Sequence, residues 1–266
     1  MIRIKPKSAQ SKKTYIAGNN SATLNTQNMK FKVFLIVVIT SIFLTDCKEK
    51  EDPAPEVIIK IQVTDSFVFA KSGDFSFEID ASDITATISV VGAGGGGGGG
   101  IIGTKKTNST GGGGGAGSGE VKLFEDIVLT QGATYSVKVG AAGNGGNTGS
   151  HGGDGLSSNI SLNSDVLFSA NGGKGGRSDD VNVVNGAVGG EGFVNGKTGG
   201  NGEFLGTFSF NGRAGRGGIG GVNTSNLGNG GDGGIGTAIV NLTLVDPEEG
   251  VKGNNGFVKV VWTGLK

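Results

Sequence analysis

The chain has 266 residues, of which 56 are glycine and only one is cysteine, and its 23 basic residues balance 23 acidic ones. That balance is uneven along the chain, because residues 1–46 hold seven Lys and Arg against a single acid, Asp46, and the remainder is mildly acidic. Without a basic stripe the composition argues against nucleic-acid binding, and a lone cysteine excludes an internal disulfide.

The first part of the chain has the pattern of a secretion signal. Within residues 29–46 two lysines precede an apolar run that is short for a membrane span. Cys47 follows in LTDC, which resembles the signal of bacterial lipoproteins, although Asp46 stands where a small residue is usual. The resemblance implies a lipid on Cys47, and the KEKED that follows resembles a surface-export signal. A plain secreted protein or an uncleaved anchor is the alternative.

We divide the chain on this basis into four parts. Residues 1–28 are interpreted as an N-terminal extension before the true start, 29–46 as the signal peptide, and 47–56, charged and proline-containing, as an extended tether. Residues 57–266 are expected to form the folded domain. The lipoprotein signal implies a bacterial cell envelope, with the protein held by its lipid in the outer membrane and exposed at the cell surface.

The folded part begins and ends with strand patterns. Val, Ile, Phe and Thr are concentrated in short segments, and polar and apolar residues alternate in several of them. No segment after residue 47 has a helical period. We expect strands at 58–70, 75–79, 86–91, 120–129, 134–139, 238–245 and 257–262.

Glycine occupies every third position through residues 140–155, which read GAAGNGGNTGSHGGDG, and shorter runs of the same period recur as far as residue 234. Three residues per turn is the period of the polyproline-II helix, which has no internal hydrogen bonds. A bare glycine edge lets a neighbouring backbone approach closely enough to supply those bonds, and the absence of proline preserves the N–H donors. We therefore expect an all-β chain in which strands flank a bundle of packed polyglycine-II helices, with no significant α-helix.

Two other kinds of chain are also rich in glycine, the collagen triple helix and the flexible linker. Collagen needs a long unbroken repeat rich in proline, whereas these runs break after a few turns. A flexible glycine linker stays an alternative, because glycine loses much backbone entropy on ordering. The 14 phenylalanines and the strands that bracket the glycine runs favour an ordered domain.

Four stretches resemble a glycine-rich domain family that includes receptor-binding tips of phage tail fibres and the extracellular glycine-rich region of anaplastic lymphoma kinase. They are ISVVGAGGGGGGG, the stretch from GGGGGAGSGEVKLF to TYSVKVGAAGNGG, SANGGKGG and GFVKVVW, and the resemblance covers about residues 66–263. It implies a β-framework beside packed polyglycine-II helices, with partners recognised by loops.

Signals for chemistry are sparse. VVGAGGGGG contains G-x-G-x-x-G, but a dinucleotide site needs a helix next, and a glycine block does not form one. GSHGGDGLS at 149–157 nearly matches a calcium-binding repeat, so Asp154 is kept as a candidate ligand although no metal site is predicted. His151 is the only histidine. Zinc sites and histidine-based triads therefore lack their parts, and we predict neither an enzyme nor a cofactor.

The sequence thus predicts a surface lipoprotein that presents a glycine-rich binding or adhesion module, with a surface protein or glycan as partner. Four segments between the glycine runs are the candidate contact loops, and the first two of those named below are polar and free of glycine. The alternatives are a passive surface-coat or spacer protein, and an ice-binding bundle, which would need a flat face of small residues. The candidate loops are 104–110, 177–184, 203–210 and 222–227, and the candidate binding residues are Lys105, Lys106, Asn108, Arg177, Asp179 and Asp180.

Overall fold

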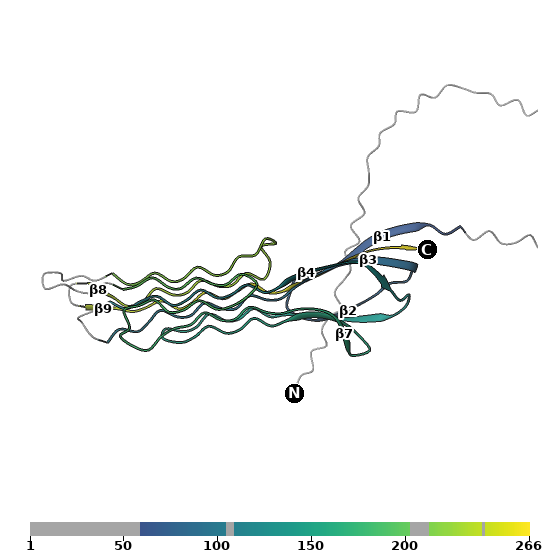
Figure 1. The fold of residues 1–266 in the computed structure, drawn as a ribbon. Helices are drawn as coiled ribbons and strands as arrows, with labels where there is room; N and C mark the ends of the chain where they lie inside the picture. Colours follow the sequence, from purple (N-terminus) through teal and green to yellow (C-terminus); the bar gives the residue numbers. More distant parts are fainter. Residues whose placement is uncertain (1–58, 105–108, 203–212, 241–242) are drawn as a thin grey trace, which may run out of the picture. The chain divides into compact units, whose positions relative to one another are not determined.

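The computed structural model describes residues 59–104, 109–202, 213–240 and 243–266. Lys60–Lys266 forms a compact unit, in which antiparallel sheets adjoin a long array of glycine-rich segments (Figure 1). The described residues contain no α-helix, so the prediction of an all-β chain is confirmed. The expected signal peptide, Cys47 and the tether lie outside the described residues.

Two four-stranded sheets and one short hairpin contain all the strands of the described residues. The first sheet has the order β1-β10-β3-β4, the second β2-β5-β6-β7, and β8 and β9 form the hairpin. The bounds are β1 Gln62–Phe69, β2 Gly73–Glu78, β3 Ser82–Val91, β4 Val121–Leu129, β5 Thr134–Val139, β6 Ser158–Leu162, β7 Asp165–Ala170, β8 Ala238–Val240, β9 Thr243–Val245 and β10 Phe257–Leu265.

The two larger sheets enclose the hydrophobic core. Alternate residues of β3, β5 and β10 are buried, as the period-two pattern predicts. Aromatic rings join the sheets: Phe77 stacks on both Phe67 and Tyr135, with ring centroids 5.0 and 5.1 Å away. Stacked rings of this kind add to the burial of apolar area, so this cluster fixes how the sheets pack.

The strand predictions hold except in two places. The segment 238–245 was expected to be one strand but forms the hairpin of β8 and β9. The hairpin of β6 and β7 was not predicted. Its turn places Asn163 and Ser164 at φ of 50° and 73°, a left-handed pair that usually carries Asn-Gly, so Asn-Ser gave no clear turn signal.

The glycine runs form a bundle in which two inner segments, 92–103 and 109–120, lie antiparallel. Along the first, N–H groups donate in rotation to three antiparallel neighbours: Gly95 to Gly117, Gly96 to Gly153 and Gly97 to Val251, at 2.8–3.1 Å. The pattern repeats every third residue, which is the period of polyglycine-II helices.

The carbonyls of the same inner segment accept from three parallel neighbours. Gly94 accepts from Gly143, Gly95 from Gly231 and Gly96 from Gly176. Each inner segment therefore has six hydrogen-bonded neighbours, as in a hexagonal array. The outer segments, in order around the array, are 140–149, 150–156, 171–177, 187–193, 194–202, 213–222, 228–237 and 248–256.

This order of neighbours arranges the bundle in three layers. The middle layer holds both inner segments, with 140–149 and 194–202 at its edges. One broad face of the bundle is formed by 150–156, 171–177 and 187–193, and the other by 213–222, 228–237 and 248–256. Both faces are flat because each consists of three segments that lie side by side, and we call each of these segments a row.

Bare glycine edges make this packing feasible. A Cβ added to Gly97 would lie 1.8 Å from the carbonyl oxygen of Asp232, and one added to Gly96 would lie 1.9 Å from that of Asn144. Long side chains project where a segment faces outward, as at Lys174, which is exposed, whereas the buried side chains near the base are small, as at Ala93 and Ala116. The structure thereby accounts for the three-residue glycine period.

The bundle has a base, where it joins the sheets, and a tip at its other end, where β8 and β9 lie (Figure 1). The inner segment 92–103 continues β3 away from the sheet, and 109–120 returns to β4. β10 leaves the base, and its last residues pair with the first residues of β1, Leu265 opposite Gln62. The domain therefore begins and ends at the side of the sheets that faces away from the tip.

Candidate functional site

The connections between bundle segments are distributed unequally between the two ends. At the base, neighbouring outer segments are joined by the turns at 193–195 and 223–227 and by the β6–β7 hairpin of the second sheet. At the tip there is one tight turn at 148–150, and elsewhere the chain runs through the longer stretches 178–186, 238–240 and 243–247. The described residues on either side of 105–108 and of 203–212 also lie at the tip. Outside the two four-stranded sheets, non-repetitive sequence is thus concentrated at the tip.

Two buried threonines close the bundle at the tip. The N–H of Thr237 donates to Oγ1 of Thr110 at 2.8 Å, and the N–H of Gly103 donates to Oγ1 of Thr237 at 2.8 Å. The Thr110 hydroxyl donates in turn to the carbonyl of Ile101. Both threonines are essentially inaccessible to solvent. The hydroxyls add to the regular backbone bonds here, since the N–H of Thr237 also donates to the carbonyl of Ile101 at 3.2 Å and the N–H of Thr110 to that of Thr237 at 3.0 Å. We call the pair the threonine clamp.

The stretch 178–184 is held across the tip by further bonds. The N–H of Asn182 donates to the carbonyl of Ile102 at 2.8 Å, and the Asn182 side chain bonds both the N–H and the hydroxyl of Thr104. At the start of the stretch the N–H of Ser178 donates to Nδ1 of His151 at 2.9 Å. The chain here has a defined conformation, which is what a recognition loop requires.

Two of the predicted binding residues, Asp179 and Asp180, lie on this stretch, and a third, Arg177, is the last residue of the bundle segment before it. Arg177 and Asp180 are exposed and Asp179 is half-buried. Among the described residues, the two salt bridges join Lys122 to Glu120 and Lys174 to Asp154, so neither aspartate of the stretch has an ionic partner there. The guanidinium of Arg177 and the carboxylates of Asp179 and Asp180 therefore lie close together in the sequence, where the chain reaches the tip.

The remaining candidates lie elsewhere. Lys105, Lys106 and Asn108 are outside the described residues, but Thr104, which precedes them, contacts Asn182. The structure thus brings the start of loop 104–110 beside loop 177–184. Loop 222–227 lies at the base, because the carbonyl of Gly228 accepts from Gly119 close to β4.

Asp154, the candidate metal ligand, uses both carboxylate oxygens within the protein. Oδ2 pairs with Nζ of Lys174 and Oδ1 accepts the N–H of Gly175, at 2.8 and 2.9 Å. The hydrogen bond from Lys174 holds the pKa of Asp154 below its ordinary value of 3.8. The same bond raises the pKa of Lys174. The described residues contain no cluster of three or more His, Cys, Asp or Glu suited to a metal ion.

The stability that this pair contributes should depend on pH in a defined way. Asp154 has a lowered pKa, so its contribution is present above the aspartate's unfolded pKa and is lost as pH falls through the folded value. The contribution of Lys174 is complete at neutral pH and is lost only as strongly alkaline pH is reached. Both side chains are largely exposed, so solvent screens the pair and keeps its contribution small.

Asp154→Asn should therefore lower the thermal midpoint slightly at pH 7, and the difference from the wild type should shrink as the pH falls through the acid range, as measured by calorimetry. Asp165→Asn, at an exposed aspartate for which no salt bridge is found among the described residues, serves as the control. A difference for Asp154→Asn that stays constant from pH 7 into the acid range would contradict the role of the charge.

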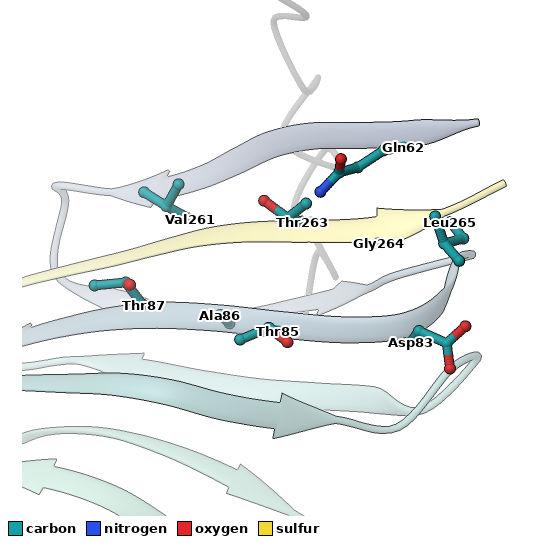
Figure 2. A pocket seen from close by; sticks show the side chains of 9 residues that line it. All are labelled: Gln62, Asp83, Thr85, Ala86, Thr87, Val261, Thr263, Gly264 and Leu265. Atoms are coloured by element: carbon teal, nitrogen blue, oxygen red, sulfur yellow. The ribbon is translucent and has the colours of Figure 1, made fainter. Parts of the chain in front are cut away.

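A shallow hollow of about 530 Å³ lies on the outer face of the first sheet (Figure 2). Its lining comes from β1, β10 and β3 and is mostly threonine and aliphatic, with Asp83 as the one carboxylate. One carboxylate among hydroxyls provides no acid–base pair and no nucleophile with a neighbouring base. The hollow therefore does not resemble a catalytic site.

The threonine clamp and the Asn182–Thr104 contact were not predicted from the sequence. Both join residues more than 70 positions apart, and neither threonine nor asparagine stands out by type in such a chain.

No helix within the described ranges is long and apolar enough to cross a bilayer.

Comparison with known proteins agrees with this architecture. A search of curated protein sequences finds no match to the chain. Residues 70–256, well over half of the chain, match the family described as "Glycine-rich domain". The match begins within the strand framework and ends where β10 leaves the bundle. The chain belongs to the glycine-rich domain family.

Proposed function

We propose that the protein is a cell-envelope lipoprotein that binds a partner at the cell surface through the loops at the tip of its bundle. The observation that carries the proposal is the unequal distribution of loops described above. A rigid array holds stretches without glycine periodicity together at one end, and binding residues are commonly found on loops that a rigid scaffold positions.

The position of the first described residues supports display. Ile61 pairs with Lys266 beyond the paired ends of β1 and β10, so the chain enters the domain at the side of the sheets remote from the tip. A tether attached there leaves the tip free. Lipidation of Cys47 is the attachment that we propose, on the resemblance of LTDC to a lipoprotein signal.

The chemistry of the tip favours a polar partner. Arg177, Asp179 and Asp180 can form charge-assisted hydrogen bonds, which are about twice as strong as neutral ones and directional. Surface glycans and polar protein loops offer matching donors and acceptors. The resemblance to phage tail-fibre tips, whose loops recognise receptors, supports the same class of partner.

Changing the tip should abolish binding and leave the fold intact. Fluorescently labelled residues 57–266 would be applied to a bacterial glycan array and to intact bacterial cells, in the wild type and as Arg177→Ala/Asp180→Ala. We expect at least a tenfold loss of retained fluorescence in the double variant. Thr224→Ala/Ser225→Ala, in the exposed turn at the base, is the matched control and should bind as the wild type does.

Equal binding by the tip and base variants would refute a binding site at Arg177 and Asp180. No retention of the wild type on any surface would favour the passive coat or spacer. Incorporation of radiolabelled palmitate into the full chain, lost in Cys47→Ser, tests the anchor separately. An ice-binding function finds less support, because both broad faces carry large side chains, among them Lys174 and Arg216.

A further inference from the structure

The two broad faces of the bundle both carry charged and apolar side chains, but they arrange them differently. The face formed by 150–156, 171–177 and 187–193 carries the Asp154–Lys174 pair, and we call it the charged face after this ion pair. Its exposed large apolar side chains, Leu156, Val188 and Phe193, come from its two outer segments alone. The opposite face, formed by 213–222, 228–237 and 248–256, carries exposed branched aliphatic side chains from all three of its segments together with exposed charges, and we call it the aliphatic face.

Four side chains define the aliphatic face: Ile219 and Val222 from one outer row, Ile235 from the middle row and Val251 from the other outer row. They are 58%, 53%, 37% and 54% exposed. Single exposed aliphatic residues are ordinary on protein surfaces, so the distinguishing feature of this group is that it extends across all three segments of one flat face.

The hydrogen bonds place these residues next to one another. The N–H of Val251 donates to the carbonyl of Asp232 in the middle row, one turn from Ile235 along that row. On the other side the N–H of Gly233 donates to the carbonyl of Gly218, the residue before Ile219. The aliphatic side chains therefore lie at similar heights along the bundle, across its whole width.

Charges flank the aliphatic residues in a matching order. The two outer rows both run from tip to base, since 213–222 follows the tip stretch and 248–256 leads to β10. In one row Arg216 lies one turn tipward of Ile219, and in the other Glu248 lies one turn tipward of Val251. The outer rows thus present an arginine and a glutamate at corresponding heights, each followed by an aliphatic side chain.

We propose that the aliphatic face binds the same face of a second copy of the chain, about a twofold axis parallel to the bundle. Such an axis exchanges the two outer rows. Arg216 of each copy then meets Glu248 of the other, Ile219 meets Val251, and Ile235 lies near its own counterpart at the axis. A self-complementary patch of this kind is what a twofold interface requires.

The axis has a consequence for orientation. A twofold axis parallel to the bundle leaves both tips at one end and both entry points of the chain at the other. Two copies tethered to one membrane can therefore associate without strain. The contact face is narrow, which is typical of weak dimers, and tethering raises the effective concentration of the partner.

Asp232 limits the affinity. Its carboxylate lies in the middle row, near its counterpart at the proposed axis, and accepts the N–H of Gly220 at 2.7 Å. Like charges facing each other oppose association. Asp232→Asn retains an oxygen acceptor for Gly220 and removes the repulsion, so this variant should dimerise at least threefold more tightly than the wild type.

The test is sedimentation equilibrium of residues 57–266, which include the whole compact unit, between 5 µM and 1 mM. The wild type should dimerise, and Arg216→Glu should weaken the dimer at least tenfold. Arg216→Glu combined with Glu248→Arg should restore the affinity, since the charges then meet with exchanged signs. A wild type that stays monomeric at 1 mM, or a double variant as weak as the single one, overturns the proposal.

Cross-linking in the membrane gives a second measurement that does not depend on affinity in solution. Ile235→Cys in the full chain, with Cys47 lipidated so that its sulfur is not a free thiol, should yield a covalent dimer with a short bismaleimide. Val188→Cys on the charged face is the matched control, because its side chain is more exposed, at 58%, yet should not be bridged. Equal cross-linking at both positions would mean random collision and would also overturn the proposal. Neither measurement involves the tip, so either result leaves the proposed function to its own test.

Discussion

Gly97→Ala is expected to destabilise the protein more than any exposed substitution, by at least about 4 kcal/mol. Gly97 lies at the middle of an inner segment, and an added Cβ would lie 1.8 Å from the carbonyl oxygen and 2.3 Å from the carbonyl carbon of Asp232. Both contacts are with backbone, so the neighbouring segment would have to move away, and its hydrogen bonds to both inner segments would lengthen. For a domain of this size the loss corresponds to a fall in the thermal midpoint of at least about 8–16 °C.

Gly153→Ala is the matched control. It lies within the same three-residue repeat, but its side chain would face outward, with the nearest heavy atom, the Asn144 nitrogen, at 3.3 Å. We expect the thermal midpoint to stay within about 2 °C of the wild type, because the small clash offsets a gain of at most about 1 kcal/mol from a stiffer unfolded chain. A tolerated alanine at Gly97 would contradict the packing of the bundle.

The second large effect is expected at the threonine clamp. Thr237→Val keeps the shape of the side chain but removes the oxygen that accepts the N–H of Gly103 at 2.8 Å. A buried N–H left without a partner costs about 1–3 kcal/mol. The hydroxyl also donates to the carbonyl of Ile101 at 3.3 Å, so we expect a total near about 3 kcal/mol.

The stability lost in Thr237→Val should be concentrated at the tip of the bundle. Hydrogen exchange measured by mass spectrometry is expected to accelerate in peptides covering 99–104 and 178–184, and to remain slow at the base of the bundle. Thr198→Val, at an exposed position of an outer segment, should change neither stability nor exchange. Uniform acceleration along both inner segments would show that the clamp stabilises the bundle as a whole, which contradicts a local role.

Local periodicity carried most of the fold prediction. Glycines such as Gly143 and Gly146 recur every third residue, and this spacing led directly to packed helices with bare edges. The alternation in 257–262 likewise led to β10. These features depend on residues within a few positions of each other, so a single sequence reveals them.

The order of neighbours in the bundle could not be predicted. Every outer segment has the same glycine edge and the same period, so nothing in the repeat distinguishes which segment bonds to which. Ile219, Ile235 and Val251 therefore read as isolated residues in the sequence, although they lie on one face. The same holds at the tip. Loops 104–110 and 177–184 were predicted from their polarity, but the contact of Thr104 with Asn182 follows from the parallel packing of 92–103 and 171–177, which both end at the tip.

The six-neighbour arrangement of the first inner segment also governs how the chain can fold. Gly94 and Gly97, near residue 95, donate to Asn254 and Val251, more than 150 residues later, and β10 completes the first sheet between β1 and β3. A chain whose central contacts are this distant in sequence has a high contact order, and such chains fold slowly. A chain lacking residues 247–266 has neither the outer segment 248–256 nor β10, so neither the bundle nor the first sheet can be completed before the last residues are synthesised.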